Sequence, residues 1–255
     1  MSAERAPASE DAVLGGRLVL RQPRDGHRVG HDAILLAAAT SARSGEHAVD
    51  LGAGVGAAGL ALARRVDGLA VTLVEIEAAL AALARENAAR NGLGERVRAV
   101  CLDVAAPAGA FAAAGLAPAT ADRVLMNPPF NTAQNPSPDR GRRVAHVASH
   151  ETLGRWMGVA ARLLRPQGVV TLIWRADGLA AVLAALADGF GGIALLPVHP
   201  KPGAPAIRVL ARAIRGSRAP LSLLPGFTLA DESGKPSAEA EAVLRAGATL
   251  PLARD

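Results

Sequence analysis

Short apolar runs rich in Val, Leu and Ile alternate along the chain with longer segments whose apolar residues recur every three or four positions. The short runs predict buried strands, and the longer segments predict amphipathic helices. Strands that alternate with helices are typical of an α/β sheet covered by helices. The predicted strands are residues 48–51, 71–74, 97–102, 123–126, 169–174, 193–196 and 207–214. The predicted helices are residues 33–40, 56–65, 77–91, 152–164, 179–187 and 238–246.

The two ends of the chain have a different pattern from its middle. Residues 1–11 are small and polar and predict a disordered N-terminus. Residues 12–30 predict short N-terminal strands around a Gly-Gly turn. We expect the main domain at residues 31–215 and a C-terminal tail with one short helix at residues 216–255.

The predicted strand at 123–126 stops at Asn127, Pro128, Pro129 and Phe130. Proline has no N–H for a strand ladder and a fixed φ, so the chain must leave the sheet here in a rigid loop. Ligands bind at the carboxyl ends of strands in open α/β sheets. The Asn127 oxygen can accept hydrogen bonds, and Phe130 offers a flat face for stacking. These residues suit an amino group on a flat ring or an amide, although a proline-rich strand exit of no further function has the same sequence.

Three earlier strands also end in residues that suit a ligand. The first runs into a glycine-rich loop with Gly52, Ala53 and Gly54, which lets a ligand approach the backbone and the start of a helix. The second ends in Glu75, and an acid at this place suits the two hydroxyls of a ribose. The third is followed by Asp103 and Val104. Together they outline an adenosine site, with Glu75 on the ribose and Asp103 near the adenine amino group.

Two further segments have an open interpretation. Asp32 stands where a helix begins, so it is either an N-cap or a ligand-binding residue. Residues 131–144 are polar and carry three arginines, which predicts a loop at the active edge. That loop either grips a substrate or is a solvated connection.

Composition narrows the class of protein. The net charge is +5, and all but two of the basic residues are arginines, which permits but does not require a nucleic-acid partner. No apolar run is long enough to span a membrane, so we expect a cytoplasmic protein. One cysteine and six scattered histidines give no metal-ligand spacing, so no metal site is expected.

The residues from Val49 to Gly54, with Asp50 among them, resemble the first motif of class I S-adenosylmethionine-dependent methyltransferases. Glu75, Asp103 and the Asn-Pro-Pro-Phe loop fall where that family has its ribose acid, adenine acid and amino-methylating motif. The resemblance covers about residues 29–214 and implies S-adenosylmethionine as cofactor. It also implies a Rossmann-like sheet of seven strands, mostly parallel with one antiparallel strand, and helices on both faces.

Residues 28–36, the Asn-Pro-Pro loop and residues 148–151 are more narrowly similar to bacterial tRNA adenine-N6 methyltransferases that act on valine tRNA. This implies methyl transfer to the N6 amine of adenine in RNA, near a tRNA anticodon. The chain has His31 and Phe130 where that group commonly has Thr and Tyr. Guanine-N2 methyltransferases of ribosomal RNA share the Asn-Pro-Pro-Phe form, and protein glutamine-N5 methyltransferases act on an amide with the same two N–H donors. A nucleotide-binding module without activity is the third alternative.

Overall fold

The computed structural model describes residues 8–24, 29–129 and 140–253, and for residues 140–150 it describes the backbone only. Its centre is one sheet, in which β3 is flanked by β4 and β5 on one side and by β6 and β7 on the other. The main strands are β3 (His47–Leu51), β4 (Ala70–Glu75), β5 (Val97–Cys101), β6 (Ala121–Met126), β7 (Leu164–Arg175), β8 (Phe190–His199) and β9 (Arg208–Arg215).

Strand directions agree with the prediction of a mostly parallel sheet. β9 lies between β7 and β8 and is antiparallel to both, whereas the pairs among β3, β4, β5, β6 and β7 are parallel. The fold class, including one antiparallel strand among seven, is therefore confirmed. The chain order reverses at β3, so the carboxyl ends of β3 and β6 form the switch point at which open α/β sheets bind ligands.

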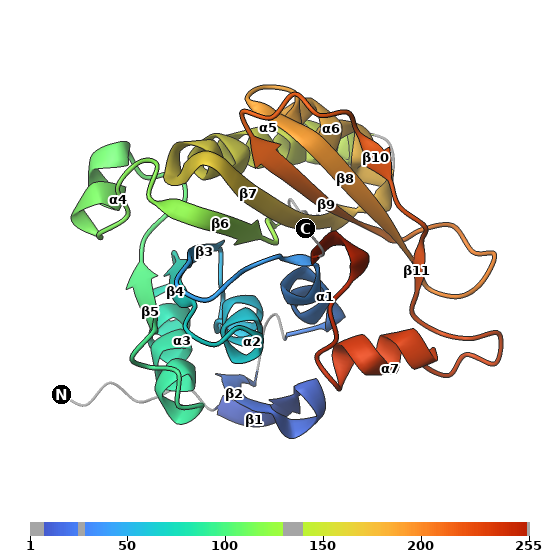
Figure 1. Ribbon diagram of the computed structural model, residues 1–255, viewed down its shortest axis with the longest axis horizontal. Coiled ribbons are helices and arrows are strands. Elements are labelled where there is room, and N and C mark those ends of the chain that lie inside the picture. Colours follow the sequence, from blue (N-terminus) through green and yellow to red (C-terminus); the bar gives the residue numbers. More distant parts are fainter. Residues whose placement is uncertain (1–7, 25–28, 130–139, 254–255) are drawn as a thin grey trace.

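Helices cover both faces of the sheet and create two apolar cores (Figure 1). One core packs α1, α2 and α3 against one face, and the other packs α4, α5 and α6 against the opposite face. None of the helices in the described ranges combines the length and apolar character needed to cross a bilayer. The helices are α1 (His31–Ala39), α2 (Ala57–Arg65), α3 (Ala78–Arg90), α4 (Ala108–Ala113), α5 (Arg140–Leu163), α6 (Leu179–Leu186) and α7 (Ala238–Leu244).

The N-terminal segment is more ordered than its composition suggests. Residues 1–7 lie outside the described residues, but β1 (Ala8–Val13) pairs antiparallel with β2 (Leu18–Pro23). The prediction of disorder through residue 11 is therefore wrong from Ala8 onward. Polar residues of β1 find partners on other elements: Glu10 pairs with Arg90 on α3, and Asp11 accepts from Gln22.

Two further boundaries differ from the prediction. α5 begins at Arg140, whereas the sequence predicted a loop through residue 144 and a helix only from residue 152. Arginine and alanine are good helix formers, and no proline follows Pro138 until Pro166, so the charge of this segment did not indicate a loop.

The tail after Gly216 adds β10 (Ser222–Leu223) and β11 (Phe227–Thr228), both parallel to β8, so the sheet has nine strands and extends past residue 215.

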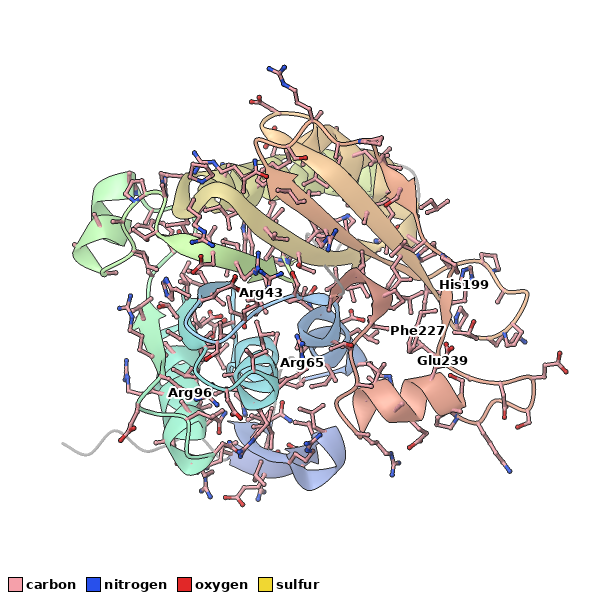
Figure 2. The ribbon with its side chains drawn as sticks, viewed as in Figure 1. Arg43, Arg65, Arg96, His199, Phe227 and Glu239 are labelled. Atoms are coloured by element: carbon pink, nitrogen blue, oxygen red, sulfur yellow. The ribbon has the colours of Figure 1, made fainter. Side chains whose placement is uncertain are left out.

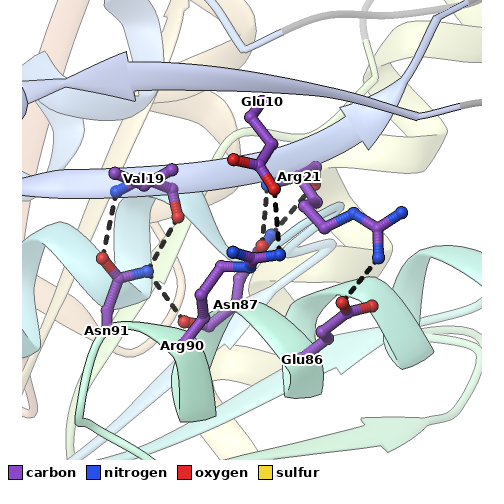
Figure 3. Close-up of polar contacts among 7 residues, drawn as sticks. All are labelled: Glu10, Val19, Arg21, Glu86, Asn87, Arg90 and Asn91. Atoms are coloured by element: carbon purple, nitrogen blue, oxygen red, sulfur yellow. Dashed lines mark hydrogen bonds and ion pairs between the residues drawn. The ribbon is translucent and has the colours of Figure 1, made fainter.

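Asn87 of α3 and Asn91, the C-cap residue of that helix, hold the free edge of β2 as a partner strand would (Figure 3). Asn91 Oδ1 accepts from Val19 N at 3.0 Å, and its Nδ2 donates to Val19 O at 2.9 Å. Asn87 makes the same pair with Arg21, at 2.8 and 3.0 Å. Residues four apart on a helix rise about 6 Å, close to the roughly 6.6 Å between residues two apart on a strand. Asn87 Nδ2 also donates to Val55 O, which ties the hairpin to the glycine-rich loop.

We expect Asn87→Ala to lower the free energy of unfolding by about 3 kcal/mol, because Asn87 is fully buried and its loss leaves backbone groups of Arg21 and Val55 without partners. Asn91→Ala should cost roughly half as much, because Asn91 is partly exposed and water can replace its amide. Urea denaturation of both variants measures the difference. Equal losses in the two variants would show that Asn87 has no special role.

Candidate functional site

A cavity of about 820 Å³ opens at the carboxyl ends of β3, β4, β5 and β6. It brings together predicted site residues from five separate segments of the chain. Phe130, the remaining one, lies outside the described residues. The predicted residues that line the cavity are Asp32, Asp50, Gly52, Ala53, Gly54, Glu75, Asp103, Val104, Asn127, Pro128 and Pro129.

The loop after β3 is shaped by glycine. Gly52 has a φ of +68°, and a Cβ built on it would lie 2.3 Å from Trp156 Cη2. Both the backbone conformation and the close approach of the indole therefore require glycine here. The loop is tied to β4, since Ala53 N donates to Val74 O at 2.9 Å.

Glu75 is buried at the end of β4, and its carboxylate organises the surrounding backbone. Its Oε2 accepts from Gly54 N at 2.8 Å, and its Oε1 accepts from Glu77 N at 2.9 Å. Glu77 occupies the N-cap position of α3. Each carboxylate oxygen can accept a second hydrogen bond, so Glu75 can still receive two donors from a ligand in the cavity.

Asp50 lies under the glycine-rich loop and is 2% exposed. Its Oδ2 accepts from Gly59 N at 2.8 Å. Burial raises the pKa of Asp50 to about 7, the nearby Glu75 charge also raises it, and the Gly59 N–H opposes the rise. Near neutral pH, part of the population therefore carries a proton on this carboxyl group.

The raised pKa of Asp50 has a consequence for stability. A folded-state pKa of about 7 against an ordinary value of 3.8 means that the fold favours the protonated carboxyl group. This contribution is fully present below about pH 4 and is lost as the pH rises through 7. Relative to Asp50→Asn, which does not titrate, the unfolding free energy should fall by about 4 kcal/mol over this range. Urea denaturation across the range tests this, and parallel pH profiles for the two proteins would contradict it.

Asp32 does not cap its helix. The N-cap of α1 is Gly30, without a side-chain cap, and Asp32 lies in the first turn. Its Oδ2 accepts from Arg208 Nε at 2.9 Å, across 176 residues of sequence. Both residues line the cavity, so this ion pair joins the start of α1 to the start of β9 at the cavity wall.

Apolar and polar groups alternate on the cavity wall next to Glu75. Ile76 is 59% exposed, unusual for a large apolar residue, and lines the cavity with the buried Val104. Asp103 is exposed, and its Oδ1 accepts from Ala105 N at 2.7 Å. An apolar wall beside a free carboxylate oxygen suits the faces and the amino edge of a purine.

Asn127 follows β6 directly, as its sequence predicted, and lines the cavity with Pro128 and Pro129. Its Oδ1 is buried and has no hydrogen-bond partner among the described residues. A buried amide oxygen without a partner costs about 1–3 kcal/mol. A ligand that donates an N–H to this oxygen would recover that free energy.

Sequence reasoning missed Trp156 as a site residue. It projects from α5 against Gly52 and lines the cavity. The chain has only two tryptophans, and Trp174 is buried in the core. A tryptophan on the helix that follows the Asn-Pro-Pro loop was therefore an available signal. Arg208 was missed as well, because nothing local links it to Asp32.

The described residues contain no group of three or more His, Cys, Asp or Glu side chains arranged to hold a metal ion. His199, labelled in Figure 2, contacts its own loop, where its Nδ1 lies 2.7 Å from Ala204 O.

Known proteins resemble the chain over most of its length. The model of the methyltransferase small domain family matches residues 27–194. The tRNA1(Val) (adenine(37)-N6)-methyltransferase of Phocaeicola vulgatus is 31% identical over 184 residues, which cover 72% of this chain and 75% of that protein. The protein of the same description from Bacteroides fragilis is 30% identical over 192 residues, with the same two coverages.

Solved structures share the fold. A protein of Agrobacterium tumefaciens described as a predicted O-methyltransferase has a TM-score of 0.73 and 29% identity, covering 86% of this chain and 98% of its own. An O-methyltransferase of Thermotoga maritima, described as S-adenosylmethionine-dependent, has a TM-score of 0.54 and 18% identity. It covers 76% of this chain and 68% of its own, and at this identity it shows the fold alone.

Proposed function

Because the chain belongs to the methyltransferase small domain family, we propose that it transfers a methyl group from S-adenosylmethionine to the N6 amine of adenine in tRNA. The observation that carries this proposal is the buried Oδ1 of Asn127, which has no partner in the described part of the chain and lines a cavity together with Glu75. An acceptor that waits for an N–H donor suits an exocyclic amine. The relatives at 30–31% identity are described as adenine-N6 methyltransferases of a tRNA.

The cavity residues fit the cofactor. A volume of about 820 Å³ is within the usual range for small-molecule sites, and leaves room for a target base beside the cofactor. When bound, S-adenosylmethionine supplies an electrophilic methyl group on a sulfonium. Glu75 would accept both ribose hydroxyls, and Ile76 and Val104 would face the adenine ring with Asp103 at its amino edge. The backbone around Gly52 and Gly54 would admit the amino-acid part, near the acids Asp32 and Asp50.

The loop after β6 would prepare the acceptor nitrogen. The lone pair of an exocyclic amine is delocalised into its ring, which makes the nitrogen a weak nucleophile. Hydrogen bonds from its two N–H groups to Asn127 Oδ1 and the Pro128 carbonyl would favour a tetrahedral nitrogen with its lone pair toward the methyl group. Pro129 would keep the loop rigid, and Phe130 would stack on a flipped base. Catalysis of this kind depends on positioning more than on a general base.

A labelled methyl group tests the substrate. The protein, with S-adenosylmethionine labelled in the methyl group, is offered unmodified tRNA, ribosomal RNA and release factors separately, and the products are digested and identified. We expect N6-methyladenosine from tRNA. Label in N2-methylguanosine of ribosomal RNA, in methylglutamine of protein or on a hydroxyl would keep the fold and cofactor but overturn the acceptor.

A further inference from the structure

A second cavity, of about 260 Å³, lies between the N-terminal hairpin, α1, α2 and the C-terminal tail. Three of its lining residues are arginines: Arg17 after η1 (Leu14–Gly16), and Arg64 and Arg65 at the end of α2. None of the described residues that line it is acidic. The cavity therefore gathers three positive charges in a space as large as about nine water molecules.

Each guanidinium is fixed by backbone carbonyl groups and by no carboxylate among the described residues. Arg17 Nη1 donates to Ala246 O at 2.6 Å, and Arg64 Nη2 donates to Asn91 O at 3.0 Å. Arg65 Nη2 donates to Ala37 O and Thr40 O at the end of α1. In Figure 2, Arg65 lies between α1 and α2. One nitrogen of each group thus orients the side chain, and the other N–H groups have no partner in the described part of the chain.

Arg65 is the least exposed of the three arginines, since Arg17 and Arg64 are open to water. Burial lowers the pKa of Arg65, because its charge loses part of its hydration there. The negative end of α1 compensates this charge only in part, through the two carbonyls that Arg65 contacts. A phosphate group offers at least two acceptor oxygens and, as a diester in a nucleic-acid backbone, one negative charge to guanidinium groups already held in place.

We propose that the second cavity binds a phosphate group, and that this phosphate belongs to the backbone of the RNA substrate. The link to RNA rests on the function proposed above. The two cavities share the helix pair α1 and α2, with Ala58 lining the first and Arg65 the second. Seven residues along a helix span about 10 Å. Because an RNA carries a phosphate at every nucleotide, a strand whose base enters the first cavity has phosphates within this distance.

The test uses the double variant Arg17→Gln and Arg64→Gln, because both side chains are exposed and Arg65 also caps α1. Methyl transfer to the RNA substrate should show a KM for RNA raised at least about tenfold, because the double variant loses the charge-assisted hydrogen bonds of two arginines to the phosphate. The slope of log affinity against log salt should become shallower by about 0.7–0.9, the contribution of the one phosphate contact that is lost. The kcat and the Kd for S-adenosylmethionine should not change. The double variant Arg218→Gln and Lys235→Gln, which also removes two exposed positive charges but outside both cavities, is the charge-matched control and should behave as the unmodified protein.

A second measurement identifies the source of the phosphate. Pyrophosphate should raise the melting temperature of the protein saturated with S-adenosylmethionine, and this rise should disappear in the double variant. An unchanged KM and salt slope together with pyrophosphate binding would overturn the RNA assignment in favour of a free phosphorylated compound. Absence of both effects would overturn the site. If no RNA is methylated at all, the proposed function fails, and the pyrophosphate measurement alone decides whether the cavity binds phosphate.

Discussion

Asn127→Ala should reduce methyl transfer by about a thousandfold, the loss typical of removing one preorganised group that stabilises a transition state. Asn127 Oδ1 is a buried acceptor without a partner among the described residues, and it directly follows β6, whose carboxyl end lies at the switch point. Alanine leaves the amine without this acceptor, so its lone pair stays delocalised into the ring. Single-turnover kinetics with bound cofactor measure the effect on the chemical step.

Two results would separate a catalytic role of Asn127 from a structural one. The Kd for S-adenosylmethionine should stay within a few-fold of the original, because the cofactor contacts proposed for Glu75 and the glycine-rich loop do not involve the Asn127 oxygen. Asn127→Asp keeps a carbonyl-type oxygen and should retain more activity than Asn127→Ala. Parallel loss of cofactor binding and activity would count against the assignment.

Glu75→Ala should weaken binding of S-adenosylmethionine at least about a hundredfold, since two charge-assisted hydrogen bonds to a ribose are lost. It also removes the acceptor for Gly54 N and Glu77 N, which loosens the loop that admits the cofactor. Glu75→Gln should be nearly as poor, because its amide NH₂ would face one of these two backbone N–H donors. Isothermal titration calorimetry measures the Kd of each variant.

Glu95→Ala is the matched control for Glu75, since Glu95 is an exposed acid that lies outside the cavity. Its Kd should equal that of the unmodified protein. Thermal unfolding of the Glu75 variants without cofactor shows whether they remain folded. A folded Glu75→Ala protein that binds the cofactor normally would remove Glu75 from the site.

Most of the site could be predicted because its signals are local. Glu75 is the last residue of β4, Asp103 lies two residues after β5, and Asn127 follows β6 directly. Parallel strands bring their carboxyl ends to one edge, so three separate strand ends predict one site without any knowledge of packing. The fold class followed from the same alternation of strands and helices. At the start of α5 the polar and charged composition was misleading evidence for a loop, whereas the helix propensity of arginine and alanine agrees with the structure.

By itself, the sequence determined the main strands and which residues stand at their carboxyl ends. It also determined where the chain must leave the sheet, because proline and glycine restrict or free the backbone at their own positions. Only the tertiary structure decided which distant side chains meet. Asp32 pairs with Arg208, which lies 176 residues further along the chain, and Trp156 packs against Gly52. Arg17 lines the second cavity together with Arg64 and Arg65. The tertiary structure also decided that β1 is ordered, because its polar residues pair with residues of α3 and β2. These contacts cannot be predicted from the local sequence of β1.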